Sequence, residues 1–212
     1  MSKLFSELMA SITHDAGVSS IDVPDDWGMG RTTFGGLQAA LALDAMRRLV
    51  TKDVPLRTLQ ITFIAPVPVG RIQARALVLR AGKNATQTEA RIVDGDQTLA
   101  VTIGVFGLSR QSAVTIEPQQ PPVEPAKPVD FRFIPGITPS FTQHFAVKWL
   151  RGLPPFTGDT ETRHVVELGM KDSGRVTEAH VLAIADFIPP VALSMLRKPA
   201  RAGDFGLPPG IL

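Results

Sequence analysis

One segment near the N-terminus constrains the fold of this chain more than any other. The pair Gly35-Gly36 opens a stretch of helix-forming residues, LQAALALDAMRRLV, that runs from Leu37 to Val50. Its polar members are Gln38, Asp44, Arg47 and Arg48. A surface helix normally has one apolar stripe and one polar face. The pattern therefore predicts a helix that other parts of the chain enclose.

The residues that follow can form this enclosure. Residues 56–107 contain four strand-like runs and no further helix: LRTLQITFIA, RIQARALVL, ATQTEARIV and TLAVTIGVF. Turn-forming residues separate the later runs at 82–84 and 94–96. In the third run apolar and polar residues alternate, as in a sheet with one buried and one wet face. A buried helix followed by an antiparallel meander predicts an α+β hotdog fold, in which an antiparallel sheet wraps around a central helix.

A second, shorter copy of this order follows a proline-rich stretch. Seven prolines lie between residues 118 and 139, which is typical of an extended linker. Two strand-like runs, FTQHFAVKWL and TRHVVELGMK, then precede a helical run at 177–185. The repeated order suggests an internal duplication. We expect a tandem hotdog, with a first copy at 1–115, a linker at 116–138 and a second copy at 139–212 that is truncated, because no strand pattern follows residue 198.

Composition excludes several classes of function. The chain has 212 residues, 22 basic against 20 acidic, which argues against a nucleic-acid partner. It has no cysteine, which excludes disulfides, thiolate catalysis and cysteine zinc sites. Its four histidines lack metal-ligand spacing and are interpreted as surface or strand residues, so we expect neither metal nor cofactor. We see no membrane-spanning run and no signal peptide, and we expect a cytoplasmic protein.

The chain resembles the double-hotdog acyl-CoA thioesterases, the thioesterase II-like family. The resemblance lies in residues 27–30, RTTFGG with its helix, TLQITFIAPVPVG and NATQTEARIVDGDQTLAVTIGVFG, and in HVLAIADFIPPVAL of the second half. It implies two fused hotdogs that hydrolyse acyl-CoA thioesters at the junction of the two halves. It also implies a role in lipid metabolism.

Asp186 is the candidate catalytic residue. Thioester hydrolysis needs an activated water or a carboxylate nucleophile, together with donors for the oxyanion. No serine lies in a nucleophile-elbow pattern. Asp186 ends an apolar helix, and the resemblance places the family's catalytic aspartate there. The alternative is that Asp186 merely caps the turn toward Pro189.

Other positions are candidates for binding substrate. Gly35 and Gly36 either expose backbone N–H groups to the oxyanion or allow close strand-to-helix packing, and both interpretations stay open. Gln60 and Thr62, on the strand after the helix, are candidate substrate-binding residues, although many relatives carry a histidine where this chain has Gln60.

Two further expectations concern charged residues near these positions. Asp44 is expected to pair with Arg47 or Arg48 of its own helix. His180 lies six residues before Asp186, on another helix face, so a dyad with Asp186 is not expected.

Two functions stay open at this point. The first is an acyl-CoA thioesterase that releases free acid and CoA through a water activated by Asp186. The second is a non-catalytic acyl-binding or acyl-CoA-binding protein, or a shortened inactive hotdog. The family completes its site with a threonine or serine and a glutamine beyond the second helix, and residues 199–212 contain no threonine and no glutamine. A second helix without a covering sheet predicts a homo-oligomer.

Overall fold

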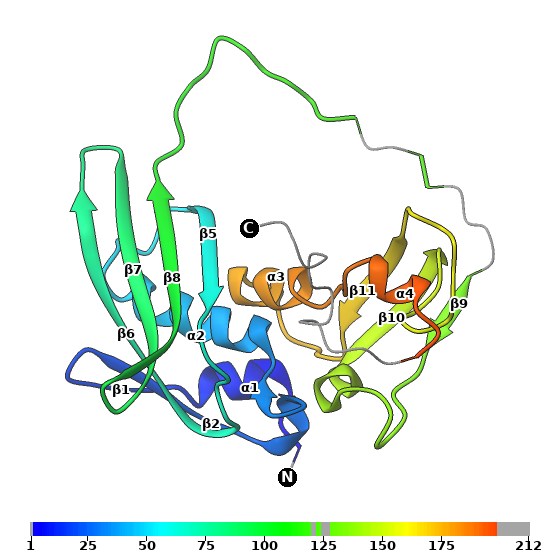
Figure 1. Cartoon of the computed structure of the whole chain (residues 1–212). Helices are drawn as coiled ribbons and strands as arrows, with labels where there is room; N and C mark the ends of the chain where they lie inside the picture. Colours follow the sequence, from blue (N-terminus) through cyan, green and yellow to red (C-terminus); the bar gives the residue numbers. More distant parts are fainter. Residues whose placement is uncertain (1, 120–121, 124–127, 199–212) are drawn as a thin grey trace, which may run out of the picture. The chain divides into compact units, whose positions relative to one another are not determined.

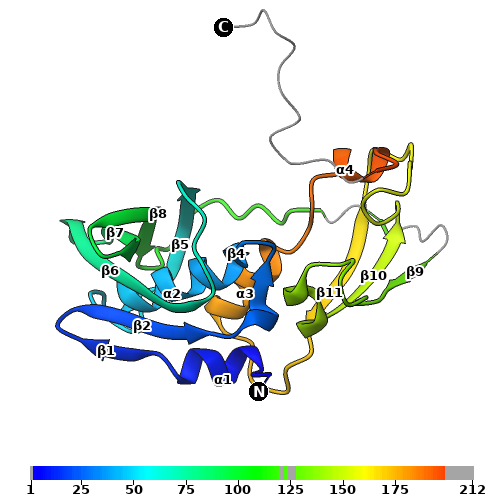
Figure 2. The ribbon, with the colours of Figure 1, turned by 60° about the horizontal axis from the view of Figure 1, so that its bottom comes forward.

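An antiparallel sheet curls around helix α2 (Gly35–Arg47), as Figure 1 shows. The structure is a computed structural model that describes residues 2–119, 122–123 and 128–198. The six strands have the order β1-β2-β6-β7-β8-β5. Their bounds are Thr13–Asp15 (β1), Val18–Val23 (β2), Leu56–Phe63 (β5), Gly70–Ala81 (β6), Ala85–Asp94 (β7) and Gln97–Gly107 (β8). In Figure 2, α2 lies between β2 on one side and β7 and β8 on the other.

The central helix is enclosed, as the sequence predicted. Leu37, Leu41 and Met46 are almost inaccessible to solvent, and so are the sheet residues Ile92 and Phe106. Along β7, Thr88, Ala90 and Ile92 are buried, whereas Gln87 and Arg91 are exposed. The α+β hotdog fold is confirmed. The observed helix begins at Gly35 and ends at Arg47, so the last three residues of the predicted helix, 48–50, lie outside it.

Short elements near the N-terminus lead the chain into α2. The sequence did not indicate helix α1 (Phe5–Ala10), whose Phe5 and Leu8 are buried. After β2 come a 3-10 turn, η1 (Asp25–Trp27), and a two-stranded ribbon of β3 (Gly28–Met29) and β4 (Thr32–Thr33). The ribbon ends two residues before α2, which fixes the position at which the helix begins.

Helix α3 (Glu178–Ala185) packs against α2. The predicted strand at 141–150 is wrong in its first part, because Ser140–His144 form a 3-10 helix, η2, and the strand β10 covers Phe145–Arg151. The start of this segment joins the core around α2 through aromatic contacts. Phe141 stacks on Phe34 at 4.1 Å between ring centroids, and Phe145 lies 4.7 Å from Phe187.

Contacts within the chain separate two units that interleave in sequence. One comprises Met1–Gln119, Phe133–Ala146 and Gly169–Phe187, and the other comprises the described parts of Gln120–Arg132, Val147–Leu168 and Ile188–Leu212. The second unit holds the three-stranded sheet β11-β10-β9, formed by β9 (Val129–Phe131), most of β10 and most of β11 (Val165–Met170), and the single turn α4 (Ala192–Met195). The predicted absence of strands after residue 198 concerns 199–212, which lie outside the described residues.

Candidate active site

The structure brings Asp186 to the start of α2. Asp186 directly follows α3, and the backbone N–H of Gly36 donates a hydrogen bond to its carboxyl group. A Cβ built on Gly35 would lie only 2.7 Å from Oδ2 of Asp186. Asp186 therefore meets Gly35 and Gly36, the two other predicted site residues at this place, although it lies far from them in sequence. A helix N-terminus presents free N–H groups and the positive end of the helix dipole, so it favours a carboxylate there.

Glycine is required at the start of α2 because other groups approach the helix closely. A Cβ on Gly36 would lie 2.7 Å from Cα of Ala183 in α3 and 2.7 Å from the ring of Phe34. Real Cβ atoms essentially never come that close to other atoms. Gly36 thus serves both interpretations given by the sequence, since it lets α3 pack closely and also donates its N–H to Asp186.

Phe63, the last residue of β5, is a neighbour of this site that the sequence analysis missed. A Cβ on Gly35 would lie 2.7 Å from Cζ of Phe63 and 3.2 Å from its Cε1. The side chain is 49% exposed despite its size. The available signal was the alternation along β5, which places Phe63 on the same side as Leu59 and Ile61.

The surroundings of Asp186 make its carboxylate more basic. Loss of hydration raises the pKa of Asp186 above its ordinary value, and the hydrogen bond from Gly36 opposes this effect without cancelling it. The residue as a whole still has substantial exposed surface. A carboxylate that solvent can reach and that holds a proton more readily than usual can accept one from water.

Gln60 and Thr62 lie apart from this arrangement. Both are exposed and sit at alternate positions to Phe63, so their side chains leave the opposite face of β5. Gln60 pairs with Ile103 of β8 and Thr62 with Val101. Their role in binding substrate stays a prediction.

The prediction that Asp44 pairs with Arg47 or Arg48 is wrong. Its Oδ2 lies 2.8 Å from Nε2 of His14 and accepts a hydrogen bond of 2.7 Å from the hydroxyl of Ser19. Arg47 instead binds Glu178 of α3 with two hydrogen bonds from Nη2, of 2.6 and 2.5 Å, and donates to the carbonyl of Val54. Asp44 and Arg47 lie three positions apart on one helix, which brings them within reach of each other. Each nevertheless pairs with a residue from another element, because those partners offer better geometry.

Three of the four histidines contradict the interpretation as surface or strand residues. One is His164, whose side chain is only 4% exposed and which precedes β11. His180 is buried within α3, and His144 is buried at the end of η2, stacked on Trp27 with ring centroids 4.1 Å apart. Nε2 of His144 lies 3.3 Å from Oδ2 of Asp26. Burial lowers the pKa of His144 below its ordinary value, and the nearby Asp26 carboxylate opposes this only in part.

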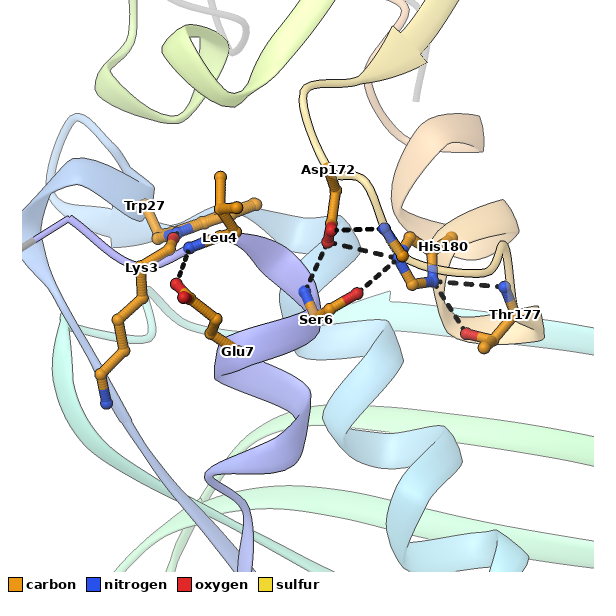
Figure 3. A network of polar contacts seen from close by, with 9 residues as sticks. Lys3, Leu4, Ser6, Glu7, Trp27, Asp172, Thr177 and His180 are labelled. Carbon is orange, nitrogen blue, oxygen red and sulfur yellow. Dashed lines mark hydrogen bonds and ion pairs between the residues drawn. The ribbon is translucent and has the colours of Figure 1, made fainter.

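His180 belongs to a polar network that contains a serine and an aspartate (Figure 3). Nε2 of His180 lies 3.3 Å from Oγ of Ser6 and 3.5 Å from Oδ2 of Asp172. Nδ1 faces Thr177 instead, at 3.3 Å from its backbone nitrogen and 2.9 Å from its hydroxyl oxygen. In a catalytic triad the serine and the acid occupy opposite ring nitrogens. Here they share one, so the network ties α1 to the start of α3 and does not activate Ser6.

Asp172 is the central acceptor of that network. It accepts a 2.7 Å hydrogen bond from the backbone N–H of Ser6, near the start of α1. Burial opposes ionisation of Asp172, but the hydrogen bonds from Ser6, Gly174 and His180 together outweigh it and hold its pKa below the ordinary value. The described partners of His180 are Ser6, Asp172 and Thr177.

Comparison with known proteins gives one family match. Residues 23–107 match the family described as "Acyl-CoA thioesterase N-terminal domain". Comparison with curated protein sequences gives no match for this chain.

Several solved structures share the fold. A protein with a hotdog fold and unknown function from Alicyclobacillus acidocaldarius is 19% identical, with a TM-score of 0.77 over 95% of this chain and 75% of that one. A proposed thioesterase from Novosphingobium aromaticivorans is 20% identical, with a TM-score of 0.68 over 84% of this chain and 71% of that one. A proposed thioesterase II from Thermobifida fusca is 15% identical, with a TM-score of 0.68 over 91% of this chain and 76% of that one. At these identities the likeness shows the hotdog fold, and its coverage of both halves agrees with a tandem arrangement.

Two features of the described residues bear on possible functions. None of the helices in this part of the chain combines the length and hydrophobicity needed to cross a bilayer. Within the same residues, no three side chains of His, Cys, Asp or Glu lie close enough together to hold a metal ion.

Proposed function

We propose that this chain, whose residues 23–107 match the acyl-CoA thioesterase N-terminal domain family, hydrolyses acyl-CoA thioesters to a free acid and CoA. The observation that carries the proposal is the carboxyl group of Asp186 at the N-terminus of α2, with a raised pKa and solvent access. The base, Asp186, thereby lies beside the first turn of α2, whose N–H groups are potential donors to the oxyanion.

In the proposed reaction Asp186 accepts a proton from a water molecule, and the resulting hydroxide attacks the thioester carbonyl carbon. Negative charge develops on the carbonyl oxygen. The N–H of Gly35 can stabilise it, because a residue at the first helical position has no acceptor within the helix. The carbon–sulfur bond then breaks, and Asp186 returns its proton to the departing CoA thiolate.

Replacement of Asp186 by asparagine tests this proposal. Asp186→Asn keeps the size of the side chain and removes its basicity, so hydrolysis of acyl-CoA should fall by a factor of ~10² or more. Release of free CoA, followed with a thiol reagent, gives the rate. Asp53→Asn, at an exposed position outside the site, is the matched control and should leave the rate unchanged. Equal rates for wild type and Asp186→Asn would contradict the assignment.

The alternative is an acyl-CoA-binding protein without catalysis. It follows from the resemblance, which implies a threonine or serine and a glutamine as partners of Asp186, because 199–212 contain no threonine and no glutamine. Calorimetric titration with acyl-CoA separates the two. Binding without release of CoA supports the alternative, whereas turnover supports the thioesterase.

We also infer the wider setting of this activity. Hotdog copies at 1–115 and 139–212, joined by 116–138, would act on acyl-CoA in cytoplasmic lipid metabolism. Apolar side chains at the second helix, such as Val181 at 56% exposure, support a homo-oligomer.

A further inference from the structure

We propose that Phe63 determines acyl specificity by forming the apolar wall that confines the carbon next to the thioester carbonyl. This inference rests on the proposed thioesterase function and concerns the same site. It follows from the position of the Phe63 ring relative to Gly35 and Asp186.

The backbone of β5 fixes the place of Phe63. Phe63 pairs with Ala100 of β8, and this register sets the end of β5 beside the start of α2. Its Cζ lies 2.7 Å from the position that a Cβ of Gly35 would take. Oδ2 of Asp186 lies at the same 2.7 Å from that position. The ring edge and the carboxylate therefore both close over the same side of Gly35.

A thioester that reacts here must place its carbonyl carbon beside Asp186 and Phe63, on the outer side of the position that they fill in front of Gly35. Its oxygen would face the N–H of Gly35 while attack comes from the side of Asp186, so the adjoining acyl carbon has to pass the ring of Phe63. The space next to Gly35 cannot accept even one methyl group without displacing the ring or the carboxylate. A branch on that acyl carbon would meet the same obstacle, whereas a straight chain can follow the ring.

The ring also affects the carboxylate directly. An apolar group beside Oδ2 excludes water from that side, which contributes to the loss of hydration that raises the pKa of Asp186. About half of the Phe63 side chain reaches solvent, so the substrate can approach along its outer side. Phe63 thus has two measurable effects, one on the choice of acyl group and one on the basicity of Asp186.

Substitution of Phe63 tests the first effect. The rates for butanoyl-CoA and 2-methylpropanoyl-CoA, which differ only in branching at the second carbon, give the ratio of kcat/KM. Phe63→Ala should lower the preference for the straight chain about tenfold or more, because one methyl group in an apolar pocket changes selectivity by ~10–200-fold. Phe63→Leu, which keeps most of the volume, should lower it less. Ile64→Ala removes the next residue, 58% exposed, and should leave the ratio unchanged. An unchanged ratio in Phe63→Ala would overturn the proposal.

A second measurement needs no turnover. The pKa of the Asp186 carboxyl group, followed by 13C NMR of the protein without substrate, should be lower in Phe63→Ala than in wild type and unchanged in Ile64→Ala. If wild type hydrolyses neither thioester while this pKa falls, the thioesterase proposal fails and the effect of the ring on the carboxylate stands. If the pKa does not move in Phe63→Ala, the inferred effect of the ring on the carboxylate is wrong, and the ratio of kcat/KM alone decides the wall proposal.

Discussion

Alanine at the two glycines that open α2 should separate catalysis from stability. Both positions have close neighbours, but the neighbours differ in kind. At Gly35 they are the ends of two side chains, Asp186 and Phe63, whereas at Gly36 they include the backbone of Ala183 and the ring of Phe34. A side-chain end can rotate away, while a backbone atom can yield only if α3 moves.

The structure gives the size of the displacement in Gly35→Ala. The new Cβ would lie 2.7 Å from Oδ2 of Asp186, against an ordinary contact of at least 3.4 Å, so the carboxylate must move by about 0.7 Å. A misplacement of about 1 Å at a reacting group can reduce the rate by ~10²-fold. We therefore expect kcat for acyl-CoA hydrolysis to fall by a factor on the order of 10 to 10².

Stability should respond in the opposite order. In Gly35→Ala the rotation of two side chains costs little and the gain in helix propensity is at most about 1 kcal/mol, so Tm should stay within ~4 °C of wild type. In Gly36→Ala the clash with Ala183 costs ~1–3 kcal/mol, from which about 1 kcal/mol of propensity is regained. Its Tm should fall by up to ~8 °C.

Calorimetry and the thiol-release assay, run on the same preparations, check this prediction. Full kcat in Gly35→Ala with unchanged Tm would refute the assignment of Asp186 as the base at this position. A Tm for Gly36→Ala at or above that of Gly35→Ala would refute the close packing of α3 on α2.

Three further outcomes are expected. Because the folded-state pKa of Asp186 lies above its ordinary value of 3.8, its contribution to stability is present below pH 3.8 and lost as pH rises through the raised pKa. Asp186→Asn should therefore have a higher Tm than wild type at pH 7, and the difference should vanish near pH 3.8. A lower Tm of Asp186→Asn at pH 7 would contradict the cause given for the raised pKa. The folded-state pKa of His144 lies below its ordinary value of 6.5, so its contribution to stability is present above pH 6.5 and lost as pH falls through the lowered pKa. Below pH 6.5, the free energy of unfolding of His144→Gln, measured with urea, should therefore depend less on pH than that of wild type. Parallel curves for the two proteins would argue against a buried neutral imidazole. Light scattering at micromolar concentration should report a homo-oligomer, with Val181→Asp shifting the mass toward the monomer, and a monodisperse wild-type monomer would refute this expectation.

The parts of the fold that follow local patterns could be predicted from the sequence. An apolar stretch of helical length predicted the enclosed α2, and alternation predicted β5 to β8 to within two residues at each end. Both signals arise from the repeat of the element itself, 3.6 residues in a helix and two in a strand. The 3-10 helix at Ser140–His144 was mistaken for strand, because it continues without a glycine or proline into the apolar residues of the strand that begins at Phe145.

The candidate site could be predicted only as separate pieces. Asp186, Gly35 and Gly36 were recognised by chemistry and by family resemblance, but their meeting depends on how α3 packs on α2. Phe63 was overlooked because nothing in its sequence neighbourhood points to Gly35, 28 residues earlier. His180 was misplaced on the surface because its partners Ser6 and Asp172 come from other elements.

Local patterns were enough to predict that an enclosed helix is followed by an antiparallel meander, since periodicity and turn residues act over a few positions. Tertiary structure alone decided that the carboxylate of Asp186 accepts the N–H of Gly36, 150 positions away, and that Asp44 binds His14 while Arg47 binds Glu178. Such pairings depend on the register of strands and on how closely helices approach. They are selected by the packing of the whole core, which no local pattern encodes.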